Sequence, residues 1–232
     1  MRATTEALRS AHRVRDVFIT DEVASANTGL VQLAVDRGVP LTVVSDRVAR
    51  ALSDTVHPQG VTAVVDIPTA QLDDVLPSDV RLVVVLDGVA DPGNAGTVVR
   101  TAAAAGADAV IFCRDSVDPY GAKCVRASAG ALLHIPVVSE AEPTDAIARL
   151  RERGMQVLAT SLDGTDVFDL REELRRPTVW LFGGEAHGLS PDVQATADRT
   201  VRIPMTPRVE SLNLAAAAAI CLYASAQALD TR

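Results

Sequence analysis

The pattern of apolar and polar residues changes twice along the chain. In residues 1–66, short apolar runs alternate with stretches whose apolar residues recur at helical spacing. The runs that predict strands are Val14–Ile19, Leu41–Val44 and Val61–Val65. The stretches that predict helices are Thr4–Ala11, Gly29–Arg37 and Asp46–Leu52. Because strands and helices alternate, we expect a small α/β unit over residues 1–66.

This alternation stops at the segment Asp66–Asp79. The segment contains Pro68, Pro77 and four acidic residues, and it shows neither helical nor strand periodicity. Prolines and clustered polar residues interrupt regular structure. We therefore expect residues 67–79 to form a linker and residues 80–232 to form a second domain.

Residues 80–232 begin with the run Val80–Leu86, which is typical of a strand buried on both faces of a parallel sheet. Further predicted strands are Ala109–Cys113, Val137–Val138, Gln156–Ser161, Thr178–Phe182 and Thr200–Ile203. The predicted helices are Gly96–Ala105, Tyr120–Leu132, Thr144–Arg153 and the alanine-rich Leu212–Leu229. This order predicts a doubly wound α/β sheet, with a ligand at the carboxyl ends of its strands.

Composition narrows the class of protein. The chain has 232 residues, of which 48% are hydrophobic, so it can bury a core and is not expected to be disordered. Its three cysteines, Cys113, Cys124 and Cys221, lack the close pairs that zinc sites need, and the four histidines show no metal-ligand spacing. We expect reduced thiols, a cytoplasmic protein and no metal. The longest apolar run, Leu214–Ala224, is too short for a membrane span, which needs about 20 residues.

The net charge of −8 argues against nucleic-acid binding by the chain as a whole, because phosphate binding needs clustered cations. The acidic excess lies downstream of residue 65, since residues 1–65 contain seven arginines and seven acidic residues. Arg9, Arg13 and Arg15 lie in one short stretch that is able to face a phosphate. A solvated helix face fits the same spacing equally well.

Glycines and small polar residues directly follow three of the predicted strands. These segments are Asp91–Gly96, Gly183–Gly188 and Ile203–Asn213. Glycine lets the backbone approach a ligand closely and leaves N–H groups free. Three such edges together predict one shared pocket for a small organic cofactor.

Common nucleotide motifs do not fit these segments. Gly183–Gly188 has the spacing GGxxxG, not the dinucleotide pattern GxGxxG, and Lys123 is the only lysine, so no phosphate-binding Gly-Lys-Ser/Thr exists. A GxSxG nucleophile motif is also absent. Single residues decide little, because Asn94, Ser211 and Asn213 would each also serve as helix caps.

Taken in order, three segments resemble the signature motifs of the SpoU/TrmH family of RNA ribose 2′-O-methyltransferases, within the knotted SPOUT class. They are Asp91–Arg100, Leu181–Leu189, and Ile203–Met205 followed by Glu210–Ala215. Residues 1–66 resemble the small α/β RNA-binding domain of many members, including the stretch His57–Val61. The third motif departs from the family pattern at Leu214 and Ala215, where valine and serine are common.

The resemblance implies an α/β domain with a deep trefoil knot, a homodimer and S-adenosyl-L-methionine as the cofactor. The cofactor residues that it implies are Gly183, Ile203, Met205 and Leu212. It assigns Arg100 to the ribose 2′-hydroxyl, with Asn94, Glu185, Ser211 and Asn213 completing the site.

The separate first unit favours ribosomal RNA as the substrate. A transfer-RNA methyltransferase and a ribosomal-RNA methyltransferase that confers antibiotic resistance remain alternatives. A non-catalytic RNA-binding or ribosome assembly factor with the same fold is the alternative from another class.

Overall fold

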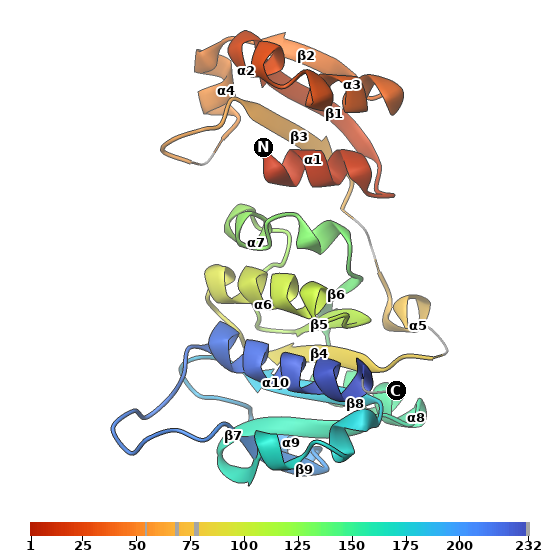
Figure 1. The fold of residues 1–232 in the computed structure, drawn as a ribbon, viewed down its shortest axis with the longest axis vertical. Coiled ribbons are helices and arrows are strands. Elements are labelled where there is room, and N and C mark those ends of the chain that lie inside the picture. The colour runs from red at the N-terminus through yellow and green to blue at the C-terminus, as the bar shows by residue number, and fades with distance from the viewer. Residues whose placement is uncertain (54, 68–69, 77–78, 231–232) are drawn as a thin grey trace. The chain divides into compact units, whose positions relative to one another are not determined.

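The computed structural model describes residues 1–53, 55–67, 70–76 and 79–230 (Figure 1). The chain divides into two compact units. The first unit comprises Met1–Pro68 with Ala129–His134, and the second comprises Thr69–Ser128 with Ile135–Arg232. Within the expected linker, residues 68–69 and 77–78 lie outside the described residues. A short helix, α5 (Leu72–Val75), lies between them, and Leu72 and Leu76 pack into the core of the second unit.

The first unit contains a three-stranded sheet with the strand order β2-β1-β3. Strand β1 (Val14–Thr20) pairs in parallel with β2 (Leu41–Val44) and antiparallel with β3 (Val61–Val65). Helices α1 (Arg2–Arg9), α2 (Asp21–Ala26), α3 (Thr28–Asp36) and α4 (Asp46–Ala51) complete the unit. Leu8, Val17, Ile19 and Ala34 are fully buried and form the centre of its core, so the expected small α/β unit is confirmed.

The second unit contains a six-stranded, fully parallel sheet with the order β6-β5-β4-β8-β7-β9. The strands are β4 (Leu82–Asp87), β5 (Ala109–Cys113), β6 (Val137–Ala141), β7 (Gln156–Asp166), β8 (Thr178–Gly183) and β9 (Arg199–Arg202). The apolar residues of β4 and β8 are fully buried. This is the burial that a continuous β-branched or aromatic run predicts in a parallel sheet.

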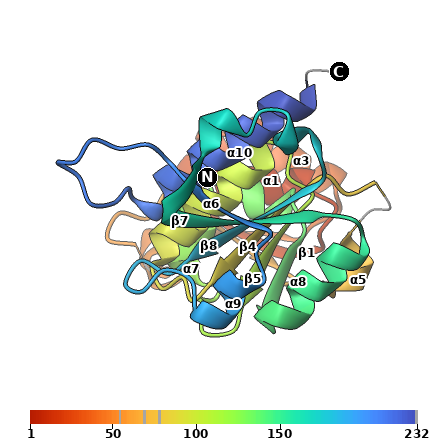
Figure 2. The same cartoon turned by 90° about the horizontal axis from the view of Figure 1, so that it is seen from below.

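Helices cover both faces of this sheet (Figure 2). One face is covered by α6 (Pro92–Ala104) and α10 (Leu214–Asp230), which pack against each other. The other face is covered by α5, α8 (Pro143–Glu152) and α9 (Pro191–Ala195). Among the described residues, no helix has the length and apolar character needed to cross a lipid bilayer. The trefoil knot implied by the resemblance stays a prediction.

Four predicted elements are wrong in extent. The strand expected at Val137–Val138 is β6, which continues to Ala141, and the helix expected from Gly96 is α6, which starts at Pro92. The helix expected at Tyr120–Leu132 is only α7 (Ala122–Ala127), because the backbone turns left-handed at Ala129 (φ 52°) and Gly130 (φ 93°). A short 3₁₀ helix, η1 (Ala131–Leu133), follows. Strand β7 continues to Asp166, beyond the expected end at Ser161, after an irregularity in its pairing with β9.

Candidate active site

The carboxyl ends of β4, β8 and β9 lie at the same edge of the parallel sheet, and their connecting segments surround a cavity of about 630 Å³. Eight residues expected at the site line this cavity. They are Asn94, Gly183, Glu185, Ile203, Met205, Ser211, Leu212 and Asn213. The sequence therefore predicted which segments would meet, because parallel strands deliver their following loops to one edge.

Other residues also line the cavity. Thr160, Ser161 and Leu162 come from β7, and His187 comes from the glycine-rich segment after β8. The β7 residues escaped sequence reasoning because no glycine-rich motif marks them. Leu162 is a large apolar residue that is 65% exposed. From the sequence alone, a residue of this type is expected in the core.

Two glycines give the cavity wall its shape. A Cβ atom on Gly183 would lie 2.0 Å from the carbonyl carbon of Gly188, and one on Gly184 would lie 2.1 Å from the carbonyl oxygen of Gly88. Real side chains do not approach backbone atoms this closely. The segment folds back on itself through a hydrogen bond from the Gly188 N–H to the Gly184 carbonyl (2.9 Å). Only glycine permits this path of the backbone.

A chain of amide and carboxylate hydrogen bonds joins the three motifs. Asn213 Nδ2 donates to Asn94 Oδ1 (2.9 Å), and Asn94 Nδ2 donates to Glu185 Oε1 (2.7 Å). The backbone N–H of Ala90 donates to the second carboxylate oxygen of Glu185 (3.3 Å). These residues are far apart in sequence, so the network fixes the loop after β4, the loop after β8 and the start of α10 relative to one another.

The helix caps differ from the simplest interpretation. Asp91, not Asn94, caps α6, accepting from the N–H groups of Gly93 (2.6 Å) and Asn94 (2.9 Å). These bonds, led by the one from Asn94, lower the pKa of the Asp91 carboxyl. Asn94 is thereby free to use its side chain in the network.

Asn213 is a helix cap as well as a member of the network. Its Oδ1 atom accepts from the N–H groups of Ala215 (2.9 Å) and Ala216 (3.2 Å), and α10 starts at Leu214. The backbone N–H of Ala215, at the position that departs from the family pattern, is satisfied by this cap. Ser211 lines the cavity but lies outside the helix.

Glu185 is held in its ionised form. Burial by itself would raise its pKa, but the hydrogen bond from Asn94 and backbone N–H groups outweigh burial, and the pKa is lowered. An ionised carboxylate accepts hydrogen bonds at both of its oxygens, whereas a protonated carboxyl donates from one of them. The network is therefore intact at neutral pH.

Arg100 lies apart from this network. It is exposed on α6, it does not line the cavity, and its side chain makes no hydrogen bond or ion pair with another described residue. Glu185, which the resemblance places in the same site as Arg100, accepts a hydrogen bond from Asn94. The structure thus gathers the residues expected to bind the cofactor but leaves the guanidinium in solvent.

The three arginines expected to bind RNA belong to the first unit and have different surroundings. Arg9 pairs with Glu6 (3.5 Å), and Arg15 pairs with Asp66. Arg13 has no such partner among the described residues. Two of the three guanidinium groups therefore face a carboxylate, and RNA binding by the three stays a prediction.

The thiols do not contribute chemistry to the cavity. Cys113, Cys124 and Cys221 are free and buried. Burial raises the pKa of Cys113 and of Cys221 to about 12, so both stay protonated at neutral pH. In the described part of the chain, no cluster of His, Cys, Asp and Glu side chains is arranged to hold a metal ion.

A glycine-walled cavity at the carboxyl edge of a parallel sheet is typical of a protein that binds a small organic cofactor. Residues 81–223 match the SpoU rRNA Methylase family, and residues 1–71 match the family described as RNA 2′-O ribose methyltransferase substrate binding. The chain belongs to the SpoU/TrmH family of RNA 2′-O-methyltransferases.

Similar proteins include enzymes that act on ribosomal RNA. The chain is 31% identical to the 23S rRNA (guanosine(2553)-2′-O)-methyltransferase RlmP of Bacillus subtilis, over 94% of this chain and 83% of that protein. It is 37% identical to the 23S rRNA (uridine(2479)-2′-O)-methyltransferase of Streptomyces viridochromogenes, over 72% of this chain and 59% of that protein. The crystal structure of the SpoU methyltransferase AviRb from the same organism, in complex with AdoMet, has a TM-score of 0.86 and 29% identity, covering 99% of this chain and 88% of that one.

The cofactor is S-adenosyl-L-methionine, as the AdoMet-bound similar structure supports. The cavity fits this molecule. Its volume lies within the range of about 300–1,000 Å³ that small-molecule sites occupy. Leu162, Ile203 and Leu212 give the cavity an apolar lining, and the Gly183–Gly184 backbone carries no side chain that would fill it.

Proposed function

We propose that this enzyme methylates the 2′-hydroxyl of one ribose in 23S ribosomal RNA. The observation that carries the proposal is the Asn94–Glu185–Asn213 network, which joins three motifs at a cofactor cavity. Two relatives are named for 23S rRNA, one at a guanosine and the other at a uridine. The two names agree on the RNA and differ in the base, so the base at the target site is left open.

The cofactor supplies an electrophilic methyl group when it is bound. In our proposal, backbone groups of Gly183, Ile203 and Leu212 hold it, with Met205 beside them. The network keeps these three segments in place before substrate arrives. Transfer from a positioned sulfonium needs mainly alignment of the reacting atoms, and alignment of this kind provides a large share of enzymatic acceleration.

Arg100 would orient the ribose 2′-hydroxyl and stabilise the negative charge that develops on its oxygen. A guanidinium stays protonated, so it is a hydrogen-bond donor and not a base. Arg100 lies six residues after Asn94 on α6, which corresponds to about 9 Å along the helix axis. The absence of a carboxylate partner within the described residues leaves this side chain available to RNA. Ser211, which lines the cavity, would contact the acceptor nucleotide.

The homodimer also belongs to this proposal. One face of α10 packs within the chain through Ala218, Cys221, Leu222 and Ser225, which are fully buried. On the opposite face the small residue Ala216 is exposed, and Tyr223 is 53% exposed. Small residues let helices approach closely, so this face of α10 is suited to a second copy of the chain. Light scattering after size-exclusion chromatography would return the monomer mass if this part of the proposal is wrong.

The central test measures transfer of labelled methyl from S-adenosyl-L-methionine to RNA that lacks modifications. The wild-type chain is compared with Arg100→Ala and with Arg171→Ala, a matched change at an exposed arginine outside the cavity. We expect wild type and Arg171→Ala to label 23S rRNA at an alkali-resistant ribose. Arg100→Ala should bind cofactor normally and lose about 100-fold or more in rate, as loss of an oxyanion donor does.

Each other result has a defined meaning. Methylation by Arg100→Ala at the wild-type rate would remove the role given to Arg100. Label in transfer RNA would favour the transfer-RNA alternative, and label at an antibiotic-binding ribosomal position would favour the resistance alternative. Cofactor binding without label in any RNA would favour the non-catalytic assembly factor.

A ribosomal substrate and three buried free cysteines both agree with the proposed cytoplasmic location.

A further inference from the structure

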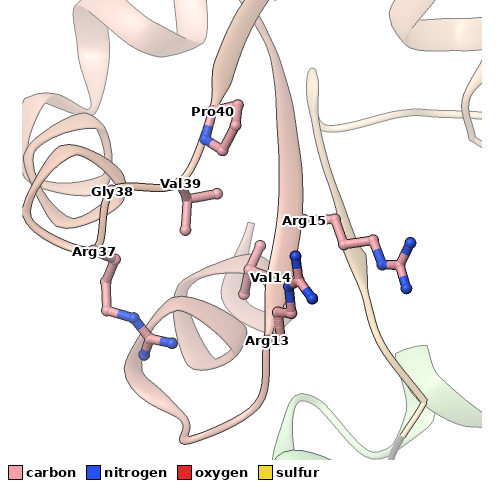
Figure 3. Close-up of a pocket in the computed structure, with 7 residues that line it drawn as sticks. All are labelled: Arg13, Val14, Arg15, Arg37, Gly38, Val39 and Pro40. Carbon is pink, nitrogen blue, oxygen red and sulfur yellow. The ribbon is translucent and has the colours of Figure 1, made fainter.

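A second cavity, of about 420 Å³, lies in the first unit, between the start of β1 and the segment that joins α3 to β2 (Figure 3). Its lining residues are Arg13, Val14, Arg15, Arg37, Gly38, Val39 and Pro40. Val14 and Val39 are 6% and 9% exposed, so the base of the cavity is formed by well-packed apolar side chains. Three of the seven lining residues are arginines, and none of the seven is acidic.

Arg37 is fixed in place by backbone carbonyls. Its Nη1 atom donates to Leu8 O (3.0 Å) and Ser10 O (2.5 Å), and its Nη2 atom donates to His12 O (3.1 Å). Carbonyl groups carry no net charge, so these bonds orient the guanidinium without neutralising it. A cation held in one orientation loses little conformational entropy when it binds an anion.

Arg13 and Arg15 differ in the charge that they offer. Arg15 pairs with Asp66 and, in Figure 3, points away from Arg37. The side chain of Arg13 is exposed and has no hydrogen bond or ion pair to a described residue. The cavity therefore combines one fixed cation, Arg37, with one free cation, Arg13. Two uncompensated positive charges beside one cavity repel each other, and an anion between them removes that cost.

We propose that this cavity binds a phosphodiester group of the substrate RNA, with Arg13 and Arg37 as the donors. The inference rests on the proposed function and gives the first unit a specific contact with the same RNA. An RNA phosphate fits better than a small acidic metabolite, because residues 1–71 match a substrate-binding domain of RNA methyltransferases. Arginine is well suited to phosphate, since its planar fork donates to two oxygens at once.

The test compares Arg13→Gln with Arg47→Gln in the full chain. Both changes remove one positive charge from the first unit, but Arg47 is an exposed residue of α4 outside the cavity. Arg37 is not the position to replace first, because its loss would also release the end of α1. Binding of unmodified 23S rRNA transcript is measured at several salt concentrations, together with KM and kcat for methyl transfer and the affinity for cofactor.

We expect Arg13→Gln to weaken RNA binding and raise KM about tenfold, and to lower the slope of log affinity against log salt by about 0.7–0.9, as one lost phosphate contact does. The kcat, the cofactor affinity and the melting temperature should stay unchanged. Arg13→Lys keeps the charge and should recover most of the affinity. Arg47→Gln should resemble wild type.

Equal RNA affinity and equal salt slopes for Arg13→Gln and Arg47→Gln would overturn the inference and leave the proposed function standing. Failure of the wild-type chain to methylate any RNA would overturn the proposed function instead. In that event the binding titrations still decide the inference, because a difference between the two variants requires neither turnover nor cofactor. Absence of any RNA binding by wild type would overturn both.

Discussion

The two cavities described above differ in the groups that form their walls. The cavity of the second unit is shaped by backbone, with Gly183 and Gly184 at its wall and a network of two amides and one carboxylate at its edge. The cavity of the first unit is shaped by apolar residues and charged by arginines. In our proposals the first of these cavities binds the cofactor through its shape, and the second binds an RNA phosphate through its positive charge.

This difference teaches which forces each region depends on. Steric contact with the backbone is short-ranged and independent of salt. Cofactor affinity should therefore fall when a single side-chain atom is added to the cavity wall. Attraction between guanidinium groups and phosphates is screened over about 10 Å at 0.1 M salt, so RNA binding by the first unit should be sensitive to ionic strength.

The largest effect is expected from Gly183→Val. Its side chain would overlap the backbone of Gly188 and Leu189, so the segment after β8 would have to move. Overpacking of this kind costs up to about 3 kcal/mol or more, and we expect cofactor affinity to fall by about 100-fold in titration calorimetry. Gly29→Ala is the control, because a Cβ there meets nothing within 4 Å. Near-normal cofactor binding by Gly183→Val would contradict the shape argument.

The second largest difference between the two cavities is expected in the salt dependence of binding. Raising monovalent salt from about 50 to 200 mM should weaken RNA binding about tenfold or more, because counterions compete for the phosphate contacts. Cofactor affinity should change by less than about twofold over the same range, since it depends mainly on backbone shape and apolar contact. Parallel titrations of RNA and cofactor measure both. An equal salt dependence of RNA affinity and cofactor affinity would contradict the proposed difference between the two cavities.

Asn94→Ala should have a moderate effect, confined to the second unit. It removes the link between Glu185 and Asn213 and leaves a carboxylate with one fewer donor. Loss of one charge-assisted hydrogen bond typically costs about 1.5 kcal/mol or more, so kcat/KM should fall about tenfold while RNA affinity is retained.

A double-mutant cycle with Asn213→Ala tests whether these residues act as one network. If they do, the two changes will be less than additive in their effect on kcat/KM. Fully additive losses would mean that Asn94 and Asn213 contribute separately. Asn27→Ala, which alters an asparagine of the first unit, should leave kcat unchanged.

The smallest effect is expected from Asp66→Asn, which frees Arg15 from its carboxylate partner. Arg15 would then add a third unpaired charge to the cavity of the first unit. Because exposed ion pairs are weak, RNA affinity should rise only about two- to threefold. Filter binding at low salt is sensitive enough to detect this change. A decrease in RNA affinity would show that Arg15 does not face the RNA.

The fold was predictable wherever apolar runs were uninterrupted. The strands at Leu41–Val44, Val61–Val65 and Ala109–Cys113 have the predicted bounds, because apolar residues stand at both ends of each run. Helices α2, α5 and α9 were missed, since four to six residues are too few to display helical periodicity. The helix α7 ends before a left-handed backbone conformation at Ala129. Alanine favours helices, so the sequence does not indicate this end.

The site was predictable as a set of segments and not as a set of contacts. Motif order placed Asn94, Glu185 and Asn213 near one another, but their hydrogen bonds join residues about a hundred positions apart. The sequence also pointed to Arg9, Arg13 and Arg15 as one group. The structure pairs two of them with carboxylates and places Arg37, the residue after α3, at the same cavity as Arg13 and Arg15. The neighbours of a surface arginine are set by tertiary contacts.

The position of Trp180 has a practical consequence. It is the only tryptophan of the chain, it is fully buried in β8, and its indole Nε1 donates to Ser225 Oγ (2.9 Å). Both tyrosines, Tyr120 and Tyr223, also belong to the second unit. Intrinsic fluorescence and near-ultraviolet dichroism will therefore report the melting of the second unit alone, and the first unit can unfold with hardly any optical signal.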